Sequence, residues 1–274
     1  MPWLSYAQNA EDVRLRRAFE GQPKGFYIDV GANHPINDSV TKHFYDIGWT
    51  GINVEPSPEP YELIVKHRTR DINLNVGCSD SDGSLTLHVG RGRATGMSTM
   101  TDGEAAVHRS KGFEFDVITV PVTTLASICT EHVGDRQIDF LSIDVEGHER
   151  AVLEGADFSR FRPRVVVIEA TRPNTNEPTH QDWEHLIVRH DYEFVVFDGL
   201  NRYYVRREDA GLGPKIALAP NVFDDFAPYR YQRQIDELNA ELLAFRAANS
   251  VLRVMHPVAQ GIGWLRRRIA ARRG

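Results

Sequence analysis

The chain has 274 residues, of which 41% are hydrophobic and 26% are charged, a composition typical of a globular protein. The formal net charge of −6 argues against a nucleic-acid-binding protein, and no segment approaches the roughly 20 consecutive apolar residues that cross a bilayer. The N-terminal residues lack the basic-then-apolar order of a secretory signal, and Cys78 and Cys129 show neither metal-ligand spacing nor a disulfide framework. We therefore expect a cytoplasmic protein.

Short runs of β-branched and aromatic residues alternate with helix-like segments between residues 26 and 206. This alternation predicts an α/β fold with a doubly wound, mostly parallel seven-stranded sheet. The first five runs are almost continuously apolar, as expected for strands covered on both faces, and the last two are close enough to form an antiparallel hairpin. The predicted strands are residues 26–30, 51–55, 71–76, 138–144, 164–169, 193–197 and 202–206.

An insertion at residues 80–123, rich in Gly, Ser and Thr, separates the third and fourth predicted strands. Insertions on a rigid sheet often form substrate-binding loops. The segment 94–100 contains a glycine and several hydroxyl groups, so we expect it to contact a polar acceptor.

A different pattern begins after a Gly- and Pro-rich segment, 207–228, which we interpret as a linker. Apolar residues then recur at spacings of three and four from Ile235 to Leu252, which predicts an amphipathic helix over 229–256 as a C-terminal extension. This helix either packs on the sheet domain or forms a homodimer through residues 231–252.

The C-terminal tail, residues 257–274, is basic. It contains five arginines and no acid, which leaves a charge of −11 on residues 1–257. The arginines alternate with large apolar side chains, so the tail is either a peripheral contact with the inner face of a membrane or a frayed basic terminus.

The ends of four predicted strands indicate a nucleoside site, since ligands of doubly wound sheets bind beyond the carboxyl ends of the strands. Gly31 follows the first strand, but no second glycine lies two positions on, which argues against a dinucleotide fingerprint. Glu55 ends the second strand, where a carboxylate can accept both hydroxyls of a ribose. Small polar residues follow the third strand, and Asp144 ends the fourth. A cationic nucleoside without phosphates, S-adenosylmethionine, fits this pattern and the acidic charge best.

Seven segments follow one another along residues 5–206: SYAQNAEDVRLRRAF, GFYIDVGANHP, SVTKHFYDIGWTGINVEPSPEPYE, DINLNVGCSDSDG, ITVPVTTLASIC, IDFLSIDVEGHERAVLEGADF and RPRVVVIEAT. Together they resemble the FkbM-type methyltransferase family. The resemblance implies a class I S-adenosylmethionine-dependent fold with strand order 3-2-1-4-5-7-6, which makes residues 1–206 the methyltransferase domain. It also implies O-methyl transfer to sugars, glycolipids or secondary metabolites.

The resemblance implies a role in cofactor binding for residues in four places. Near the N-terminus, Gln8 and Glu11 would fold over the cofactor. The alternative for Glu11 is a place on a solvated helix face. The remaining implied contacts are Asp29, Gly31 and Asn33 with the methionine end, Glu55 with the ribose, and Ser79 and Asp80 with the adenine.

The stretch that begins at Asp144 holds the catalytic candidates. An alcohol is a poor nucleophile, so an enzyme must remove its proton or bind the alkoxide to a cation. Asp144 and Glu146, with His148 as a base, could do the first, while Asp144 with Glu169 could hold Mg²⁺ for the second. The alternative is that Glu146 and Glu149 simply favour a helix N-terminus.

We therefore expect an O-methyltransferase that acts on a hydroxyl of a sugar, glycan, glycolipid or secondary metabolite. One alternative is an inactive methyltransferase-fold scaffold that associates through its C-terminal helix. A nicotinamide oxidoreductase is a third possibility, against which the missing second glycine speaks.

Overall fold

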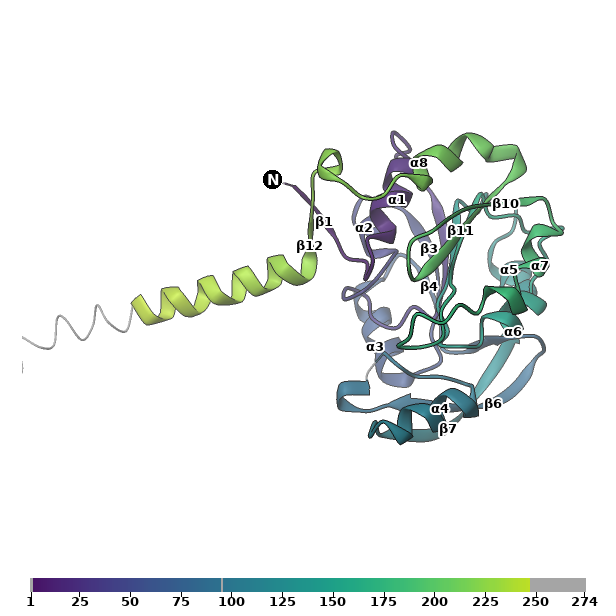
Figure 1. The fold of residues 1–274 in the computed structure, drawn as a ribbon, viewed down its shortest axis with the longest axis horizontal. Helices are drawn as coiled ribbons and strands as arrows, with labels where there is room; N and C mark the ends of the chain where they lie inside the picture. The colour runs from purple at the N-terminus through teal and green to yellow at the C-terminus, as the bar shows by residue number, and fades with distance from the viewer. Residues whose placement is uncertain (1, 95, 247–274) are drawn as a thin grey trace, which may run out of the picture. The chain divides into compact units, whose positions relative to one another are not determined.

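The computed structural model describes residues 2–94 and 96–246 (Figure 1). The chain divides into two compact units, Met1–Pro228 and Tyr229–Gly274. The first unit contains a seven-stranded sheet with the order β10-β11-β9-β8-β2-β3-β4, which is 3-2-1-4-5-7-6 when its strands are numbered along the chain. Its strands are β2 (Phe26–Val30), β3 (Thr50–Val54), β4 (Ile72–Leu74), β8 (Phe140–Ile143), β9 (Val165–Glu169), β10 (Tyr192–Phe197) and β11 (Asn201–Arg206).

Strand β11 pairs antiparallel with both of its neighbours, whereas all other pairs in this sheet are parallel. The carboxyl ends of β2, β3, β8 and β9 therefore meet at one edge of the sheet. This common edge is where the polar strand ends of the sequence come together.

Helices cover both faces of the sheet, which explains why the central strands are apolar along their whole length. One core contains α1 (Glu11–Ala18), α2 (Lys42–Asp46) and α8 (Gly213–Ala217), and Trp49 is fully buried in it. The opposite core contains α5 (Leu125–His132), α6 (Glu149–Glu154) and α7 (His185–Val188). Helix α3 (Pro58–His67) connects β3 to β4, and the short 3₁₀ turn His180–Asp182 precedes α7.

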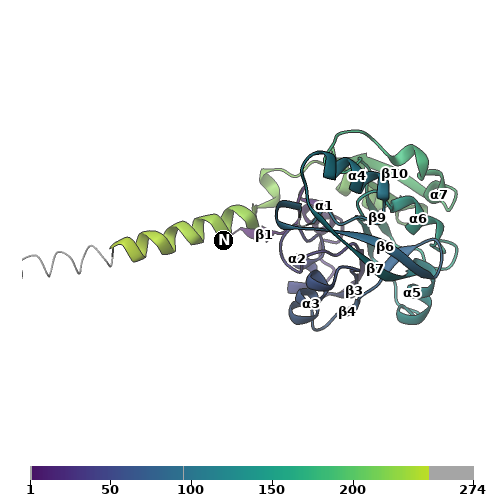
Figure 2. The ribbon, with the colours of Figure 1, turned by 90° about the horizontal axis from the view of Figure 1, so that it is seen from below.

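The insertion is a folded substructure (Figure 2). Strands β5 (Gly77–Ser79), β6 (Gly83–Gly90) and β7 (Phe115–Thr124) form a second sheet with the order β5-β7-β6. Strands β6 and β7 pair antiparallel along the full length of β6. Between them lie a 3₁₀ turn (Gly92–Ala94) and α4 (Asp102–Ser110). Strand β4 is shorter than the predicted third strand, 71–76, and residues 77–79 pair with β7 in the second sheet.

The predicted linker 207–228 is wrong, because this segment belongs to the first unit. Arg14 of α1 donates hydrogen bonds to the carbonyl oxygens of Ile216 (2.6 Å) and Leu218 (2.9 Å) at the end of α8, and Ile216 is fully buried. Helix carbonyls at a C-terminus lack partners within the helix, so the arginine satisfies them. The segment also contains the 3₁₀ helices Arg207–Leu212 and Val222–Asp224, and β12 (Phe226–Pro228), which pairs parallel with β1 (Trp3–Ser5).

The second unit is helical over residues 229–246, the described part of the predicted amphipathic helix. Ile235, Leu238, Leu242 and Phe245 are exposed on it. The rest of the predicted seam and the basic tail lie outside the described residues, so the homodimer and the membrane contact stay predictions. Within the described helices, none is both long enough and apolar enough to cross a membrane.

Candidate functional site

Two adjoining cavities lie at the carboxyl edge of the main sheet. The first has an empty volume of about 630 Å³, within the usual range for a small-molecule site, and the second, wider one has about 1420 Å³. The two cavities share one set of lining residues from the loops after β2 and β8 and from the insertion. These shared residues are Gly31, Asn33, Gly96, Asp144 and Glu146.

Gly31 brings the loop after β2 against the loop after β8. Its φ is +86°, and a Cβ at this position would lie 1.7 Å from the carbonyl oxygen of Asp144. The backbone N–H of Gly31 donates to the Val54 carbonyl (3.0 Å), and that of Asp144 donates to the Val30 carbonyl (3.0 Å). Only glycine combines this left-handed conformation with so close an approach of two backbones.

Glu55 has a fixed orientation at the wall of the first cavity. Its Oε2 accepts a hydrogen bond from the Asn33 backbone N–H (2.8 Å), and its Oε1 accepts one from the Ser57 backbone N–H (2.7 Å). Burial raises the pKa of the Glu55 carboxyl, and these hydrogen bonds oppose the increase. Each carboxylate oxygen has more than one acceptor site, so Glu55 can still bind hydroxyl donors.

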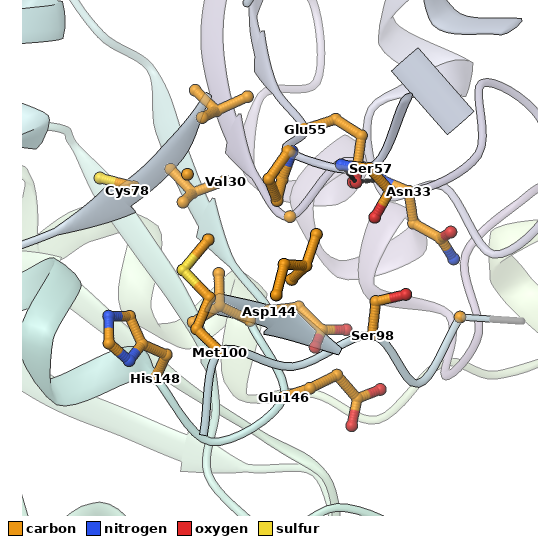
Figure 3. A pocket seen from close by; sticks show the side chains of 17 residues that line it. Val30, Asn33, Glu55, Ser57, Cys78, Ser98, Met100, Asp144, Glu146 and His148 are labelled. Atoms are coloured by element: carbon orange, nitrogen blue, oxygen red, sulfur yellow. Dashed lines mark hydrogen bonds between the residues drawn. The ribbon is translucent and has the colours of Figure 1, made fainter. Parts of the chain in front are cut away.

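His148 lies with Cys78 and Met100 on one side of the first cavity, and Asn33 and Ser57 lie on the other (Figure 3). The Nε2 of His148 is 3.0 Å from Ser79 Oγ, and burial lowers the pKa of the imidazole. His148 does not line the second cavity. Ser79 is buried, and the exposed Asp80 accepts a hydrogen bond from Ser79 Oγ (3.3 Å). Neither residue lines either of these two cavities.

Asp144 and Glu146 line both cavities, and Glu169 lines the second cavity beside them. Asp144 and Glu169 form a side-chain hydrogen bond, which requires one of the two groups to be protonated. The Asp144 side chain is exposed where it borders the cavities, yet the surrounding protein removes enough hydration to raise its pKa. Burial, followed by the charge of Asp144, raises the pKa of Glu146 to about 9, and the same causes raise that of Glu169 well above its usual range.

The insertion holds the loop that contains Glu146. Glu146 has a left-handed φ of +53°, and Thr99 Oγ1 donates a hydrogen bond to its carbonyl oxygen (2.8 Å). Thr101 Oγ1 donates to the Gly147 carbonyl (3.3 Å), and the Gly147 N–H donates to Oε1 of the buried Glu149 (3.0 Å). Glu149 thus supports the loop at the start of α6, in agreement with the helix-start interpretation.

We expect the ligand-free protein to lose stability between pH 7 and pH 9. Folded Glu11 and Glu146 have pKa values of about 8 and 9, against an ordinary value of 4.5. A carboxyl group whose pKa is higher in the folded protein than in the unfolded chain stabilises the fold fully at a pH below its unfolded pKa. This stabilisation is lost as the pH rises through the folded pKa. His43 and His148, whose pKa values are lowered by burial, change the stability only below about pH 6.5, which is outside this range.

Melting temperatures measured across this window check the expectation. For a domain of this size, each kcal/mol of lost stability lowers the melting temperature by about 2–4 °C. A melting temperature several degrees lower at pH 9 than at pH 7 therefore agrees with the expectation. Glu146→Gln should reduce the decline, while Glu62→Gln, on the exposed part of α3, should leave it unchanged. An equal or higher melting temperature at pH 9 contradicts the assignment.

Glu11 and Asp29 lie in different surroundings. Glu11 is buried and lines neither cavity, and it is not on a solvated helix face. Its Oε1 accepts a hydrogen bond from Asn201 Nδ2 (2.7 Å), so it ties α1 to β11. Gln8, three residues earlier, lines the second cavity. Asp29 also lines the second cavity, where its carboxylate accepts a hydrogen bond from Thr41 Oγ1 (2.8 Å) and burial raises its pKa to about 6.

Within residues 2–94 and 96–246, no three His, Cys, Asp or Glu side chains are grouped so that they could hold a metal ion. The predicted Mg²⁺ ligands, Asp144 and Glu169, are a pair joined by a hydrogen bond. The described part of the chain therefore gives the Mg²⁺ prediction no support beyond these two carboxyl groups.

The polar wall of the second cavity is formed by residues that the sequence did not single out. They follow the carboxyl end of β9, a position that itself could have identified them. These residues are Thr171, Asn174, Thr175 and Asn176. The insertion adds Glu104 of α4 nearby, whose carboxylate is 3.8 Å from the Arg172 guanidinium. Of the segment expected to contact the acceptor, Met97 lines the second cavity and Ser98 lines the first.

The chain is similar to known methyltransferases. The sequence profile of the methyltransferase FkbM domain matches residues 29–194. Among solved structures, the chain resembles a TehB-like SAM-dependent methyltransferase from Corynebacterium glutamicum, with 9% sequence identity and a TM-score of 0.39, over 72% of this chain and 88% of that chain. No curated protein matches the sequence. Because the profile spans more than half of its length, the chain belongs to the FkbM methyltransferase family.

Proposed function

We propose that the protein is an S-adenosylmethionine-dependent O-methyltransferase that acts on a hydroxyl of a sugar, glycan, glycolipid or secondary metabolite. The observation that carries this proposal is that Asp144 and Glu146 line both cavities at their junction. Methyl transfer needs donor and acceptor in contact at one point, with a group there that can accept a proton. Membership of the family implies S-adenosylmethionine as the donor.

The residues of the first cavity fit this cofactor. Gly31 and Asn33 allow backbone approach at the methionine end, and the oriented carboxylate of Glu55 suits the two hydroxyls of a ribose. Cys78 and His148 supply an apolar surface and a neutral imidazole for the adenine. When bound, the cofactor supplies an electrophilic methyl group on a cationic sulfur, next to the carboxyl groups of Asp144 and Glu146.

Asp144 is the proposed proton acceptor. Its raised pKa makes it a stronger base than an ordinary carboxylate, and a protonated Glu169 would hold its orientation through their shared hydrogen bond. Asp144 would take the proton of the acceptor hydroxyl as that oxygen gains the methyl group, which the bound donor would supply while its sulfur keeps the electron pair of the broken bond. Glu146 adds negative charge beside the reacting groups once it is ionised.

We assign His148 to cofactor binding. This role replaces its predicted role as a base in proton transfer. We expect His148→Gln to raise KM for S-adenosylmethionine several-fold while kcat changes less than threefold, since the side chain borders only the first cavity. Steady-state kinetics with varied donor concentration measure the two constants. A fall in kcat of a hundredfold with unchanged KM would return His148 to the role of a base.

Binding of S-adenosylmethionine distinguishes the proposed enzyme from the alternative of an inactive methyltransferase-fold scaffold. At 100 times its Kd, S-adenosylmethionine should stabilise the protein by about 2.7 kcal/mol and raise the melting temperature by several degrees. Glu55→Gln should weaken this binding about tenfold or more, because it removes a charge-assisted acceptor, while Glu62→Gln should not. Absence of stabilisation in the unaltered protein would favour the scaffold.

A further inference from the structure

The helix at residues 229–246 has an apolar stripe that is exposed in the structure. Large apolar side chains recur along it at spacings of four, three, four and three, which are the a and d positions of a heptad repeat. They lie on one face of the helix, and each is between 45% and 65% exposed. The seam, as we name this stripe, consists of Tyr231, Ile235, Leu238, Leu242 and Phe245.

The positions beside the seam are polar. Helices that pack on a globular core have apolar residues at e or g positions as well as at a and d, whereas a stripe restricted to a and d is typical of a coiled coil. The sequence continues the a and d spacing at Asn249 and Leu252, which lie outside the described residues. The seam therefore suits another seam of the same kind better than the surface of a globular domain. The described e and g positions hold Gln232, Gln234, Asn239, Glu241 and Arg246.

Two charged side chains flank the seam on opposite sides. Glu241 is at a g position and Arg246 is at the next e position, and both are exposed. Side chains three or four positions apart can form ion pairs on one helix, but within residues 229–246 neither Glu241 nor Arg246 has an opposite charge at these distances. Away from the seam, by contrast, Arg233 and Glu237 of the same helix are 3.5 Å apart. The two flanking charges are therefore available to a partner helix.

A second copy of the helix, parallel and in register, supplies the missing partners. In a parallel coiled coil, a g residue of one helix lies beside the e residue of the next heptad in the other helix. Glu241 of each copy then meets Arg246 of the other copy, so that symmetry gives the ion pair twice. An antiparallel pair brings g beside g and e beside e. In that arrangement the described positions offer Glu241 no basic partner and Arg246 no acidic one.

We propose that the helix at residues 229–246 forms a parallel, two-stranded coiled coil with a second copy of this chain. The seam is buried between the two helices, and the ion pairs of Glu241 with Arg246 set the orientation. A β-branched residue at an a position with leucine at d, as in Ile235 and Leu238, favours two strands. Residues 1–228 precede the helix, so both first units join the coiled coil at the same end. The inference is independent of the proposed methyl transfer.

Sedimentation equilibrium of the full chain tests the association. We expect a monomer–dimer equilibrium with a Kd of about 1–100 µM, since the seam is short. Leu242→Gln should weaken the dimer by about a hundredfold or more, because two buried leucine side chains are lost per pair. Leu243→Gln is the matched control, since it makes the same change outside the seam, and it should alter the Kd by less than about threefold. Both leucines are exposed in the single chain, so neither change should unfold it.

Three results would overturn the proposal. The first is a chain that stays monomeric at about 500 µM, well above the expected Kd. The second is a dimer that survives Leu242→Gln or is weakened equally by Leu243→Gln. The third is an oligomer larger than a dimer.

Cysteine cross-linking tests the orientation of the two helices. Tyr231→Cys and Phe245→Cys each place a thiol at a d position, near opposite ends of the described seam. In a parallel pair each new thiol faces its own copy, so we expect both variants to form covalent dimers with oxidised glutathione. An antiparallel pair cannot bring both positions against their own copies, so failure of either variant to cross-link would contradict the parallel arrangement. Leu243→Cys and the unaltered chain, whose two cysteines are buried, should stay uncross-linked.

Discussion

Replacing Asp144 with Asn should lower the rate of methyl transfer by about 10²–10⁴-fold, the usual contribution of a positioned general base. The amide has nearly the same shape, but it cannot accept the proton of the acceptor. We expect the fold and the binding of S-adenosylmethionine to persist, since donor contacts come mostly from other residues of the first cavity. Initial rates, thermal melting and donor titration measure these three properties, with Glu62→Gln as the control. Activity within tenfold of the unaltered protein would remove Asp144 from the mechanism.

The same assay distinguishes a proton acceptor from a metal ligand. If Asp144 and Glu169 act through their shared proton, EDTA should not change the rate and added Mg²⁺ should not raise it. Loss of activity in EDTA that Mg²⁺ restores would instead make the pair metal ligands, as the sequence first suggested.

Replacing Gly31 with Ala should weaken S-adenosylmethionine binding more than tenfold and destabilise the first unit. A Cβ at this position would lie 1.7 Å from the Asp144 carbonyl oxygen, so the loops after β2 and β8 must separate. Both loops line the first cavity, and their separation would displace the groups that face the donor. Donor titration and thermal melting measure the two effects.

Gly21 provides a matched control for this substitution. Its φ of +81° is close to that of Gly31, but a Cβ there would meet no atom within 4 Å. Gly21→Ala therefore carries only the strain of a left-handed residue, about 1–2 kcal/mol, and should leave donor binding unchanged. Equal effects of the two substitutions would show that close packing against Asp144 is not what requires a glycine at position 31.

The main sheet could be predicted from the sequence because its central strands are buried on both faces and are therefore apolar throughout. The second sheet could not be predicted in the same way. Val117 is 59% exposed, and several of its neighbours in β6 and β7 are exposed as well, so the hydrophobic signal of these strands is weak. The packing of 207–228 depends on contacts of Arg14 and Arg17 with residues about 200 positions away, which no local pattern records.

The candidate site could be predicted where strand ends determine it, as for Gly31, Glu55 and Asp144. His148 shows the limit of this reasoning. A regular helical turn from Asp144 would bring His148 to the same side, but Glu146 and Gly147 both have positive φ, at +53° and +96°. These two residues redirect the chain, so that the imidazole borders the first cavity while Asp144 and Glu146 border both.

The hydrogen bonds from Thr99 and Thr101 to the loop of Glu146 have a consequence for how this enzyme family can diversify. The segment that lines the second cavity also holds the backbone that carries a proposed catalytic carboxyl group. A change of specificity by exchange of residues 94–104 would therefore disturb catalysis unless the loop 145–147 were exchanged with it. We expect chimeras between members to be active when the two segments come from the same parent, and those that separate them to lose turnover before they lose donor binding.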